Sequence, residues 1–311
     1  MYRYKIIVNP TAGKGMAGRL IPDIDKSLKS LGINFEIVST QYPGHAVELT
    51  QQAVSEGFDV VVAAGGDGTV QEVINGLLKD RRNENPKVRM AVLPIGRGND
   101  FAFGMGVPTD FKESCQLLVN GQSHWIDVGC LSRNGSGEER YFGNGIGIGF
   151  DTVVGIEAAK LPLTGFLAYL VAALKTAFLY YRAPLIQIDL DGETITQPCL
   201  LVSVMNGRRM GGGFWMTPDS QRDDGIFDVA IAEEVNILRI FILISMVMKG
   251  AHTNEPDIKM RRSRRVVIKA LRGDLPVHAD GETVCTDCSQ LAMEILPGCL
   301  ELICNPHQPS P

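Results

Sequence analysis

The sequence has no excess of positive charge, no internal repeat, no low-complexity tract and no long apolar run at its N-terminus. Its formal net charge of −5 gives the chain as a whole no electrostatic attraction to nucleic acid, so we expect no nucleic-acid partner. Residues 1–8 predict a first strand and lack the features of a signal peptide. We therefore expect a cytoplasmic protein whose seven cysteines are reduced.

Two apolar stretches further along are too interrupted or too short to predict membrane spans. Residues 165–181 approach the required length of about 20 residues, but Lys175 interrupts them and Arg182 follows directly. Residues 237–248 are shorter and contain Arg239. We expect both stretches to be helices that are buried or face a partner, and the first also suits a surface that meets an apolar substrate. Peripheral contact with the inner face of the membrane and a homodimer both stay open.

A chain of 311 residues, 45% of them apolar, is long enough for two domains with a core each. Up to residue 127 strands alternate with helices, which predicts an α/β, doubly wound nucleotide-binding domain. Beyond it, apart from the apolar helix, the segments are short and alternating, which predicts an all-β, sandwich-like domain. We place the domains at 1–127 and 128–311, and leave open whether the last strands return to the first domain. No long linker separates the halves, so we expect the active site in a cleft between them.

The stretch from Val60 to Thr69 is an apolar strand that runs into a glycine turn. The spacing of Thr69 and Glu72 matches a capping box, so we expect a helix to start at Thr69. The N–H groups of such a turn and helix N-terminus suit a phosphate. Asp67 would repel that phosphate unless a divalent cation such as Mg²⁺ lies between them. We therefore expect a nucleotide-phosphate loop with a metal-positioning acid; a tight turn with a solvated Asp67 is the alternative.

Two other glycine-bearing loops also follow predicted strands, one starting at Asn9 and one at Pro94. In a doubly wound sheet, ligands bind beyond the carboxyl ends of the strands. The loops that start at Asn9, Gly65 and Pro94 all occupy such positions. We expect them to form one site, and their agreement is stronger evidence than any one loop.

A series of short motifs runs along nearly the whole chain. They are Asn9-Pro10 with Gly13 and Gly15, Gly65-Gly66-Asp67-Gly68-Thr69, Pro94-x-Gly-x-x-Asn99-Asp100-Phe101-Ala102, Asp127-Val-Gly, Phe142-Gly-Asn144, Gly147-Ile-Gly149-Phe150-Asp151, Asn206-Gly207, Asp224-Gly225 and Asp280-Gly281-Glu282. In this order they resemble the diacylglycerol kinase catalytic domain, most of all that of the soluble bacterial lipid kinases related to sphingosine kinases. The resemblance implies an α/β nucleotide-binding domain followed by a β-sandwich. NAD kinases share the Gly-Gly-Asp-Gly motif, so this motif alone does not decide the substrate.

The resemblance also implies a set of functional residues. The nucleotide-binding set would be Asn9, Pro10, Thr11, Ala12, Gly13, Thr40, Gly65, Gly66, Gly68, Thr69, Glu72 and Arg97. Asp67, Asp100 and Asp127 would hold Mg²⁺, partly through water, and Asp224 would hold a second, structural Mg²⁺ with main-chain oxygens of Gln221 and Ile226. Glu282 would be the general base, and Asp67 would share the catalytic work. Arg97 departs from the family, which usually carries Thr or Ser there, so the nucleotide preference stays open.

Several of these residues have a structural interpretation as well. Asp100 and Asp127 could each cap a helix or end a strand, Asp224 could lie in a plain turn, and Glu282 could be solvated beside a hairpin turn. Cys285-x-x-Cys288 lacks a second matching pair, so we do not expect a zinc site.

The sequence thus predicts an ATP- and Mg²⁺-dependent lipid kinase that phosphorylates a hydroxyl of a lipid at the membrane surface. Diacylglycerol is the leading substrate and phosphatidic acid the corresponding product. The alternatives are a kinase for phosphatidylglycerol, a sphingoid base, a soluble alcohol or NAD, and a nucleotide-binding regulator without turnover.

Overall fold

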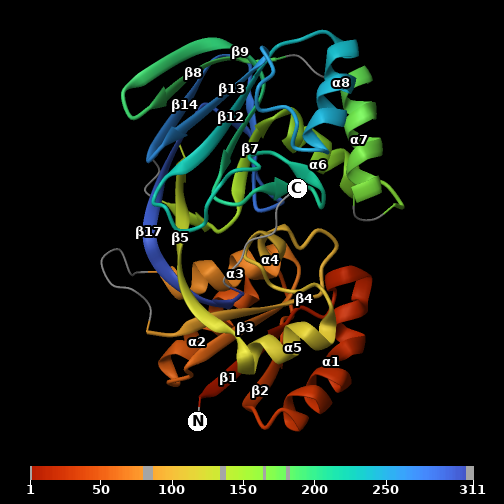
Figure 1. The fold of residues 1–311 in the computed structure, drawn as a ribbon, viewed down its shortest axis with the longest axis vertical. Helices are drawn as coiled ribbons and strands as arrows, with labels where there is room; N and C mark the ends of the chain where they lie inside the picture. The colour runs from red at the N-terminus through yellow and green to blue at the C-terminus, as the bar shows by residue number, and fades with distance from the viewer. Residues whose placement is uncertain (1, 80–86, 134–137, 164–165, 180–182, 306–311) are drawn as a thin grey trace. The chain divides into compact units, whose positions relative to one another are not determined.

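The computed structural model describes residues 2–79, 87–133, 138–163, 166–179 and 183–305 (Figure 1). The described chain divides into two compact units. Unit 1 comprises residues 2–127 and 298–305, and unit 2 comprises residues 128–297. Strand β5 (Gln122–Arg133) contains the boundary after Asp127, and strand β17 (Gln290–Cys304) contains the boundary after Pro297.

Unit 1 is an α/β unit whose strands and helices alternate along the chain. Its elements are β1 (Arg3–Val8), α1 (Ala12–Ser30), β2 (Asn34–Ser39), α2 (His45–Ser55), β3 (Val60–Gly65), α3 (Asp67–Leu78), β4 (Arg89–Pro94), α4 (Asp100–Gly104) and α5 (Phe111–Asn120). The strands pair in parallel in the order β2-β1-β3-β4. The last part of β17 pairs in parallel with β4 through Leu302 and Met90. All six residues of β3 are buried, which explains its unbroken apolar sequence.

Helices cover both faces of the unit 1 sheet. Right-handed crossovers from β1 to β2, and from β2 past β1 to β3, place α1 and α2 on opposite faces. The helix contacts agree, because α2 contacts α3 whereas α1 contacts α5. The expected doubly wound α/β fold is confirmed.

Unit 2 is rich in antiparallel strands. Its elements after β5 are β6 (Glu139–Phe142), β7 (Gly145–Gly149), α6 (Phe150–Ala159), α7 (Phe166–Leu179), β8 (Leu185–Leu190), β9 (Glu193–Met205), β10 (Arg209–Met210), β11 (Phe214–Trp215), β12 (Phe227–Glu233), α8 (Ile237–Val247), β13 (Ile258–Ser263), β14 (Arg265–Arg272), β15 (Leu275–Ala279), β16 (Glu282–Cys288) and the first part of β17. One group of strands runs β13-β12-β9-β7-β15-β16, and a second runs β9-β8-β14-β17. Strand β9 belongs to both: residues 193–198 pair with β8, and residues 199–205 pair with β7 and β12.

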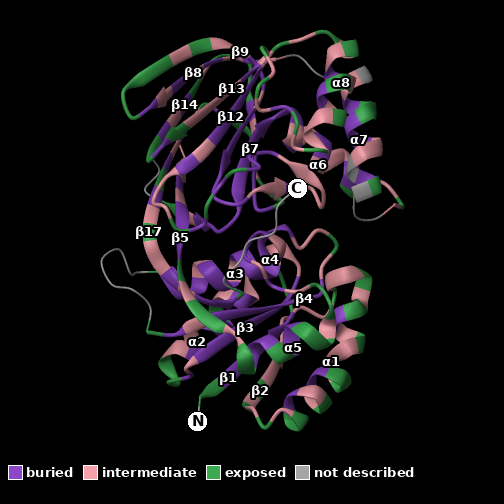
Figure 2. Ribbon diagram, viewed as in Figure 1, coloured by how far each residue is buried: buried purple, intermediate pink, exposed green. Residues whose placement is uncertain are grey.

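The two strand groups share one apolar core. Ile186 on β8 and Ile268 on β14 belong to the same buried cluster as Val202 on β9 and Val277 on β15. Figure 2 shows this buried interior along the strands of unit 2. The expectation of a β-rich, sandwich-like second half is confirmed.

In the described part of unit 2, three helices add to the strands. Helix α6 contacts α7, α7 contacts α8, and their buried side chains form a second apolar cluster (Figure 1). The helix expected at 165–181 is present at Phe166–Leu179; residues 164–165 and 180–182 lie outside the described residues. In the described parts of the chain, no helix has both the length and the apolar character to cross a membrane.

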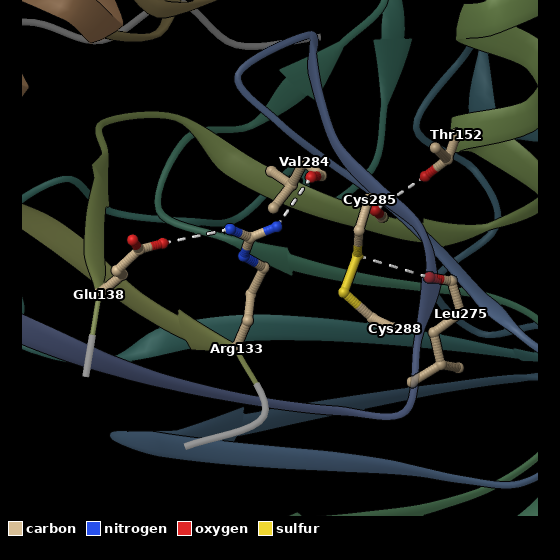
Figure 3. The surroundings of a disulfide bond; sticks show 8 residues. Arg133, Glu138, Thr152, Leu275, Val284, Cys285 and Cys288 are labelled. Atoms are coloured by element: carbon tan, nitrogen blue, oxygen red, sulfur yellow. Dashed lines mark hydrogen bonds and ion pairs between the residues drawn. A yellow bond between two sulfur atoms is a disulfide. The ribbon is translucent and has the colours of Figure 1, made fainter. Parts of the chain in front are cut away.

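Two local expectations are wrong. Helix α3 begins at Asp67 instead of Thr69, and its N-cap residue Gly66 has no side chain to form the expected capping box. The expectation of seven reduced cysteines is also wrong, because Cys285 and Cys288 form a disulfide (Figure 3). The other five cysteines, all among the described residues, take no part in a disulfide.

Candidate active site

The strand order of unit 1 creates a site for a ligand between β1 and β3. The chain leaves β1 towards α1 on one face of the sheet and leaves β3 towards α3 on the other. Such a switch point opens a crevice beyond the carboxyl ends of the two strands, where ligands of doubly wound sheets bind. The loop at Asn9 and the loop at Gly65 are the two loops that flank this point.

Side-chain hydrogen bonds tie the Asn9 loop to the glycine loop. Asn9 Nδ2 donates to Thr69 Oγ1 at 3.1 Å, and the Asn9 backbone N–H donates to the Ala64 carbonyl at 3.0 Å. Asn9 Oδ1 accepts from the backbone N–H and the hydroxyl of Thr11, at 3.1 and 2.8 Å. Thr69 thus connects the two loops from within α3, a contact that the expected capping box did not anticipate.

The third loop touches both of the others through glycines. The Ile95 N–H donates to the Gly65 carbonyl at 2.8 Å. A Cβ on Gly66 would lie 3.1 Å from the Gly96 Cα, and a Cβ on Gly13 would lie 2.9 Å from the Ile95 carbonyl oxygen. Gly13 also has φ +59, a backbone conformation that favours glycine. The structure therefore brings the three loops together, and side chains are excluded where their backbones meet.

Two of the predicted metal-binding carboxylates face one point in the third loop. A Cβ on Gly98 would lie 3.1 Å from Asp67 Oδ2 and 3.3 Å from Asp100 Oδ2. The other oxygen of Asp67 accepts the Phe101 N–H at 3.0 Å, which orients the carboxylate, and Asp100 is buried. Two negatively charged carboxylates that face one point repel each other, and a cation between them removes the repulsion. Mg²⁺ accepts one or two carboxylates together with water and phosphate oxygens. The pair fits Mg²⁺.

Asp127 lies at the end of the unit 1 part of β5 and is 1% exposed. Its Oδ1 accepts the Gly298 N–H at 2.7 Å, so it holds the returning strand β17. Across the described residues, no group of three or more His, Cys, Asp or Glu side chains is arranged to hold a metal ion. The structure thus brings Asp67 and Asp100 together but does not assemble the predicted set of three.

Glu72 contacts a helix instead of the loops. Its two carboxylate oxygens accept the N–H groups of Gly44 at 2.9 Å and Ala46 at 3.0 Å, at the start of α2. A carboxylate at this position satisfies N–H groups that have no partner within the helix and favours the positive end of its dipole. Thr40 donates its N–H to the Val8 carbonyl at 2.9 Å, and Arg97 is exposed on the third loop. Nucleotide contacts of these three residues stay predictions.

In unit 2, Glu282 begins β16 and is exposed. It follows a turn in which Asp280 and Gly281 have φ +47 and +84, and it pairs across the hairpin with Ala279. Glu282 therefore lies at the turn end of the β15–β16 hairpin, in an exposed position.

Asp280 is a structural anchor that sequence reasoning missed. It is 5% exposed, and its carboxylate accepts the N–H groups of Gly143, Asn144 and Gly145 at 2.8, 3.0 and 2.8 Å. Burial raises the pKa of Asp280 above its ordinary value, while the three N–H donors act in the opposite direction. The Asp280-Gly281-Glu282 motif and the Phe142-Gly-Asn144 motif are both visible in the sequence. Only the structure shows that the first motif binds the backbone of the second.

His278 is a second residue that sequence reasoning did not single out. Its Nε2 lies 3.6 Å from Asp151 Oδ2, and both groups occupy the space above Gly147 where a Cβ would stand. The sequence pattern around His278 did not indicate a functional residue, because its partner Asp151 is distant in the sequence.

Asp224 pairs with an arginine. Its carboxylate forms an ion pair with Arg262 and accepts the Ile226 N–H at 3.3 Å, while Gln221 is exposed. Arg262 also lies 3.5 Å from Asp228 Oδ1. The second Mg²⁺ site at Asp224, Gln221 and Ile226 stays a prediction.

A switch point with glycine loops and paired carboxylates, in an α/β unit followed by a β-rich one, is typical of kinases that bind a nucleotide. Comparison with known proteins agrees. The diacylglycerol kinase catalytic domain matches residues 3–131, and the YegS C-terminal NAD kinase beta sandwich-like domain matches residues 144–304. The chain belongs to the diacylglycerol kinase family, as the motifs indicated, and is a phosphotransferase with an alcohol group as acceptor.

Named relatives support this assignment over most of their length. A diacylglycerol kinase of Staphylococcus aureus is 30% identical over 282 residues, which cover 90% of this chain and 86% of the relative. One of Staphylococcus saprophyticus is 28% identical over 282 residues, covering 90% and 88%. The crystal structure of a Bacillus anthracis protein, whose description as a diacylglycerol kinase is itself provisional, has a TM-score of 0.79 at 27% identity and covers 98% of this chain and 97% of that chain.

Proposed function

We propose that this protein is an ATP- and Mg²⁺-dependent lipid kinase that converts diacylglycerol to phosphatidic acid. The observation that carries the proposal is the meeting of three strand-end loops, with the carboxylates of Asp67 and Asp100 facing one point, in a member of the diacylglycerol kinase family.

On the nucleotide side, the chain supplies N–H groups and space for phosphates. The backbone around Gly65, Gly66 and Gly68 leads into α3, whose N-terminus begins at Asp67. The positive end of that helix dipole favours the phosphate chain. Bound Mg²⁺ would neutralise charge on the transferred phosphoryl group, which is most of what such a reaction asks of an enzyme. Asp67 and Asp100 would hold it there.

On the acceptor side, Glu282 serves as the general base. It takes the proton from the lipid hydroxyl as the hydroxyl oxygen forms a bond to the γ-phosphorus. The bond from that phosphorus to the β,γ-bridging oxygen breaks, and ADP leaves. A positioned base contributes typically about 10²–10⁴-fold to the rate.

A lipid substrate is supported by two apolar helices of unit 2. Leu167 and Leu174 on α7 are 53% and 40% exposed, and Leu238 and Ile242 on α8 are 71% and 49% exposed. The two helices contact each other, so these side chains belong to neighbouring elements (Figure 2). A contiguous exposed apolar patch marks a membrane or protein contact, and these two helices supply side chains for one. We propose peripheral contact with the inner face of the membrane; a homodimer through the same helices is the alternative.

Transfer of labelled γ-phosphate from ATP tests the function. Diacylglycerol, phosphatidylglycerol and sphingosine are presented in mixed micelles and NAD in solution, each with and without Mg²⁺. We expect Mg²⁺-dependent phosphatidic acid as the main product. Transfer to another acceptor would correct the substrate, and nucleotide binding without transfer to any acceptor would support a regulator.

Two variants test the roles of the carboxylates. Glu282→Gln is expected to lower kcat by about 10²-fold or more with ATP binding retained, and Asp67→Asn to weaken the Mg²⁺ dependence as well. Asp287→Asn is the matched control, because Asp287 is exposed on the same strand as Glu282. Full activity of Glu282→Gln would remove the base assignment.

A further inference from the structure

The disulfide between Cys285 and Cys288 has no part in the proposed transfer, yet it lies in the strand that begins with Glu282 (Figure 3). The two Cα atoms are 6.0 Å apart and the cysteines are three positions apart in the sequence. Both belong to β16, so the bond links two positions of one strand and joins no separate elements.

A loop this small makes the bond a weak staple. A cross-link stabilises a fold by removing entropy from the unfolded chain, and this entropy grows with the logarithm of the length of the closed loop. A bond between cysteines three positions apart therefore adds little to the free energy of unfolding. Stabilisation of the fold is therefore the role that this disulfide fills least well.

The bond instead spans an irregular part of the hairpin. The register between β15 and β16 shifts between Leu275 and Val277 and again between Val277 and His278, opposite Cys288 and Cys285. Regular pairing resumes only at Thr283 and Glu282. Where the ladder is irregular, the disulfide limits how the strand can move, and this segment directly adjoins the proposed base.

The surroundings accommodate both redox states. Cys285 is half-buried, whereas Cys288 is 4% exposed, so a reductant meets the Cys285 sulfur first. The Leu275 carbonyl oxygen lies 3.8 Å from Cys285 Sγ and can accept a hydrogen bond from the Cys285 thiol once the bond is open (Figure 3). The reduced Cys285 therefore needs no new partner.

We propose that Cys285 and Cys288 form a reversible redox site that reacts with dithiols and disulfides, and that its oxidised state positions Glu282; this second part rests on the proposed function. A thiolate of the dithiol attacks Cys285 Sγ, the Cys285–Cys288 bond breaks, and Cys288 leaves as a thiolate that takes up a proton. The second thiol of the reductant then attacks the reductant's first sulfur in the mixed disulfide. The bond to Cys285 Sγ breaks, Cys285 is released and takes up a proton, and the reductant leaves as its own disulfide. Two electrons and two protons pass to the protein, and a disulfide of low molecular weight reverses the exchange.

The size of the effect follows from a second contact on the strand. Arg133 Nη1 donates to the Val284 carbonyl at 3.3 Å, and Arg133 is itself paired with Glu138 (Figure 3). Reduction therefore loosens β16 without detaching it. We expect kcat to fall by about 3- to 10-fold, well short of the about 100-fold that a misplacement of 1 Å can cause. The KM for ATP is expected to stay unchanged, because the predicted nucleotide loops belong to unit 1.

The first measurement is independent of activity. Native protein is incubated with dithiothreitol or with oxidised glutathione, alkylated, and digested, and the mass of the peptide that contains both cysteines is read. We expect two alkyl groups after reduction, none after reoxidation, and repeatable cycling. Labelling only after denaturation, or a native thiol pair that holds zinc and resists oxidation, would overturn the proposal.

The second measurement compares the kinetics of the two states. The same lowered kcat is expected for the reduced wild type and for the double variant Cys285→Ser, Cys288→Ser. In both, the acidic limb of the pH profile of kcat should also move, and a loss of folded protein would not move it. Cys130→Ser, which removes a half-buried thiol of unit 2 that lies outside the disulfide, should keep the wild-type redox response. Equal kcat and equal pH profiles in both states would refute the positioning of Glu282. Absence of transfer in both states would refute the kinase assignment, while the alkylation result would still decide the redox site.

Discussion

Removal of the Asp280 carboxylate should destabilise unit 2 in a graded way. In Asp280→Ala, three buried backbone N–H groups, those of Gly143, Asn144 and Gly145, lose their acceptor. A buried donor left without a partner costs about 1–3 kcal/mol, and since the three lie side by side and can partly relax, we expect a total of about 3–5 kcal/mol. In Asp280→Asn the retained oxygen keeps two of the three bonds. The neutral side chain also avoids the burial of charge that raises the pKa of Asp280, so we expect a loss of only about 1–2 kcal/mol.

Urea unfolding followed by circular dichroism measures both variants. Asp287→Asn serves as the control, because an exposed substitution on the adjoining strand should change the free energy of unfolding by less than about 0.5 kcal/mol. A loss below about 1 kcal/mol for Asp280→Ala, or an equal loss for both variants, would refute the anchoring argument.

Three further perturbations test other contacts. Glu72→Ala should cost unit 1 about 1–2 kcal/mol by freeing the start of α2, with an unchanged KM for ATP in the transfer assay; a clear rise in that KM would restore Glu72 as a nucleotide contact. Burial lowers the pKa of His252 below the ordinary 6.5, so on acidification the unfolded chain binds a proton at this histidine before the folded protein does. The contribution to stability is therefore fully present above pH 6.5 and is lost as the pH falls below 6.5. His252→Gln should flatten this part of the urea-midpoint profile, and an unaltered profile would contradict the assignment. Gly147→Ala should cost about 1–3 kcal/mol because its Cβ meets Asp151 and His278, whereas Gly155→Ala, in α6 with no atom within 4 Å, should gain about 0.5–1 kcal/mol; melting temperatures that move alike would count against this difference.

The fold class could be predicted from the sequence because it depends on local patterns of apolar and polar residues within single strands and helices. The unbroken apolar run of β3 and the alternation in β8 follow directly from burial on two faces or on one. The meeting of the three loops was also predictable, since parallel strands bring their carboxyl ends to one edge of a sheet.

The parts that escaped prediction depend on contacts between distant residues. Strand β9 changes its partners near residue 199, and nothing in its local pattern marks the change. The capping box failed because Thr69 and Glu72, although correctly spaced, bind Asn9 and the start of α2 instead of each other. The Cys285–Cys288 disulfide was missed because the general expectation for the compartment outweighed a spacing that allows the bond.

The return of β17 to unit 1 has a consequence for the way this protein is made. Residues 298–305 complete the sheet beside β4, yet a ribosome synthesises them only after the whole of unit 2. Until then β4 presents an edge without its final neighbour, and such edges attract other strands. Unit 1 must therefore stay without its last strand while unit 2 is being synthesised, and a chain that ended before residue 298 would leave the edge of β4 unpaired.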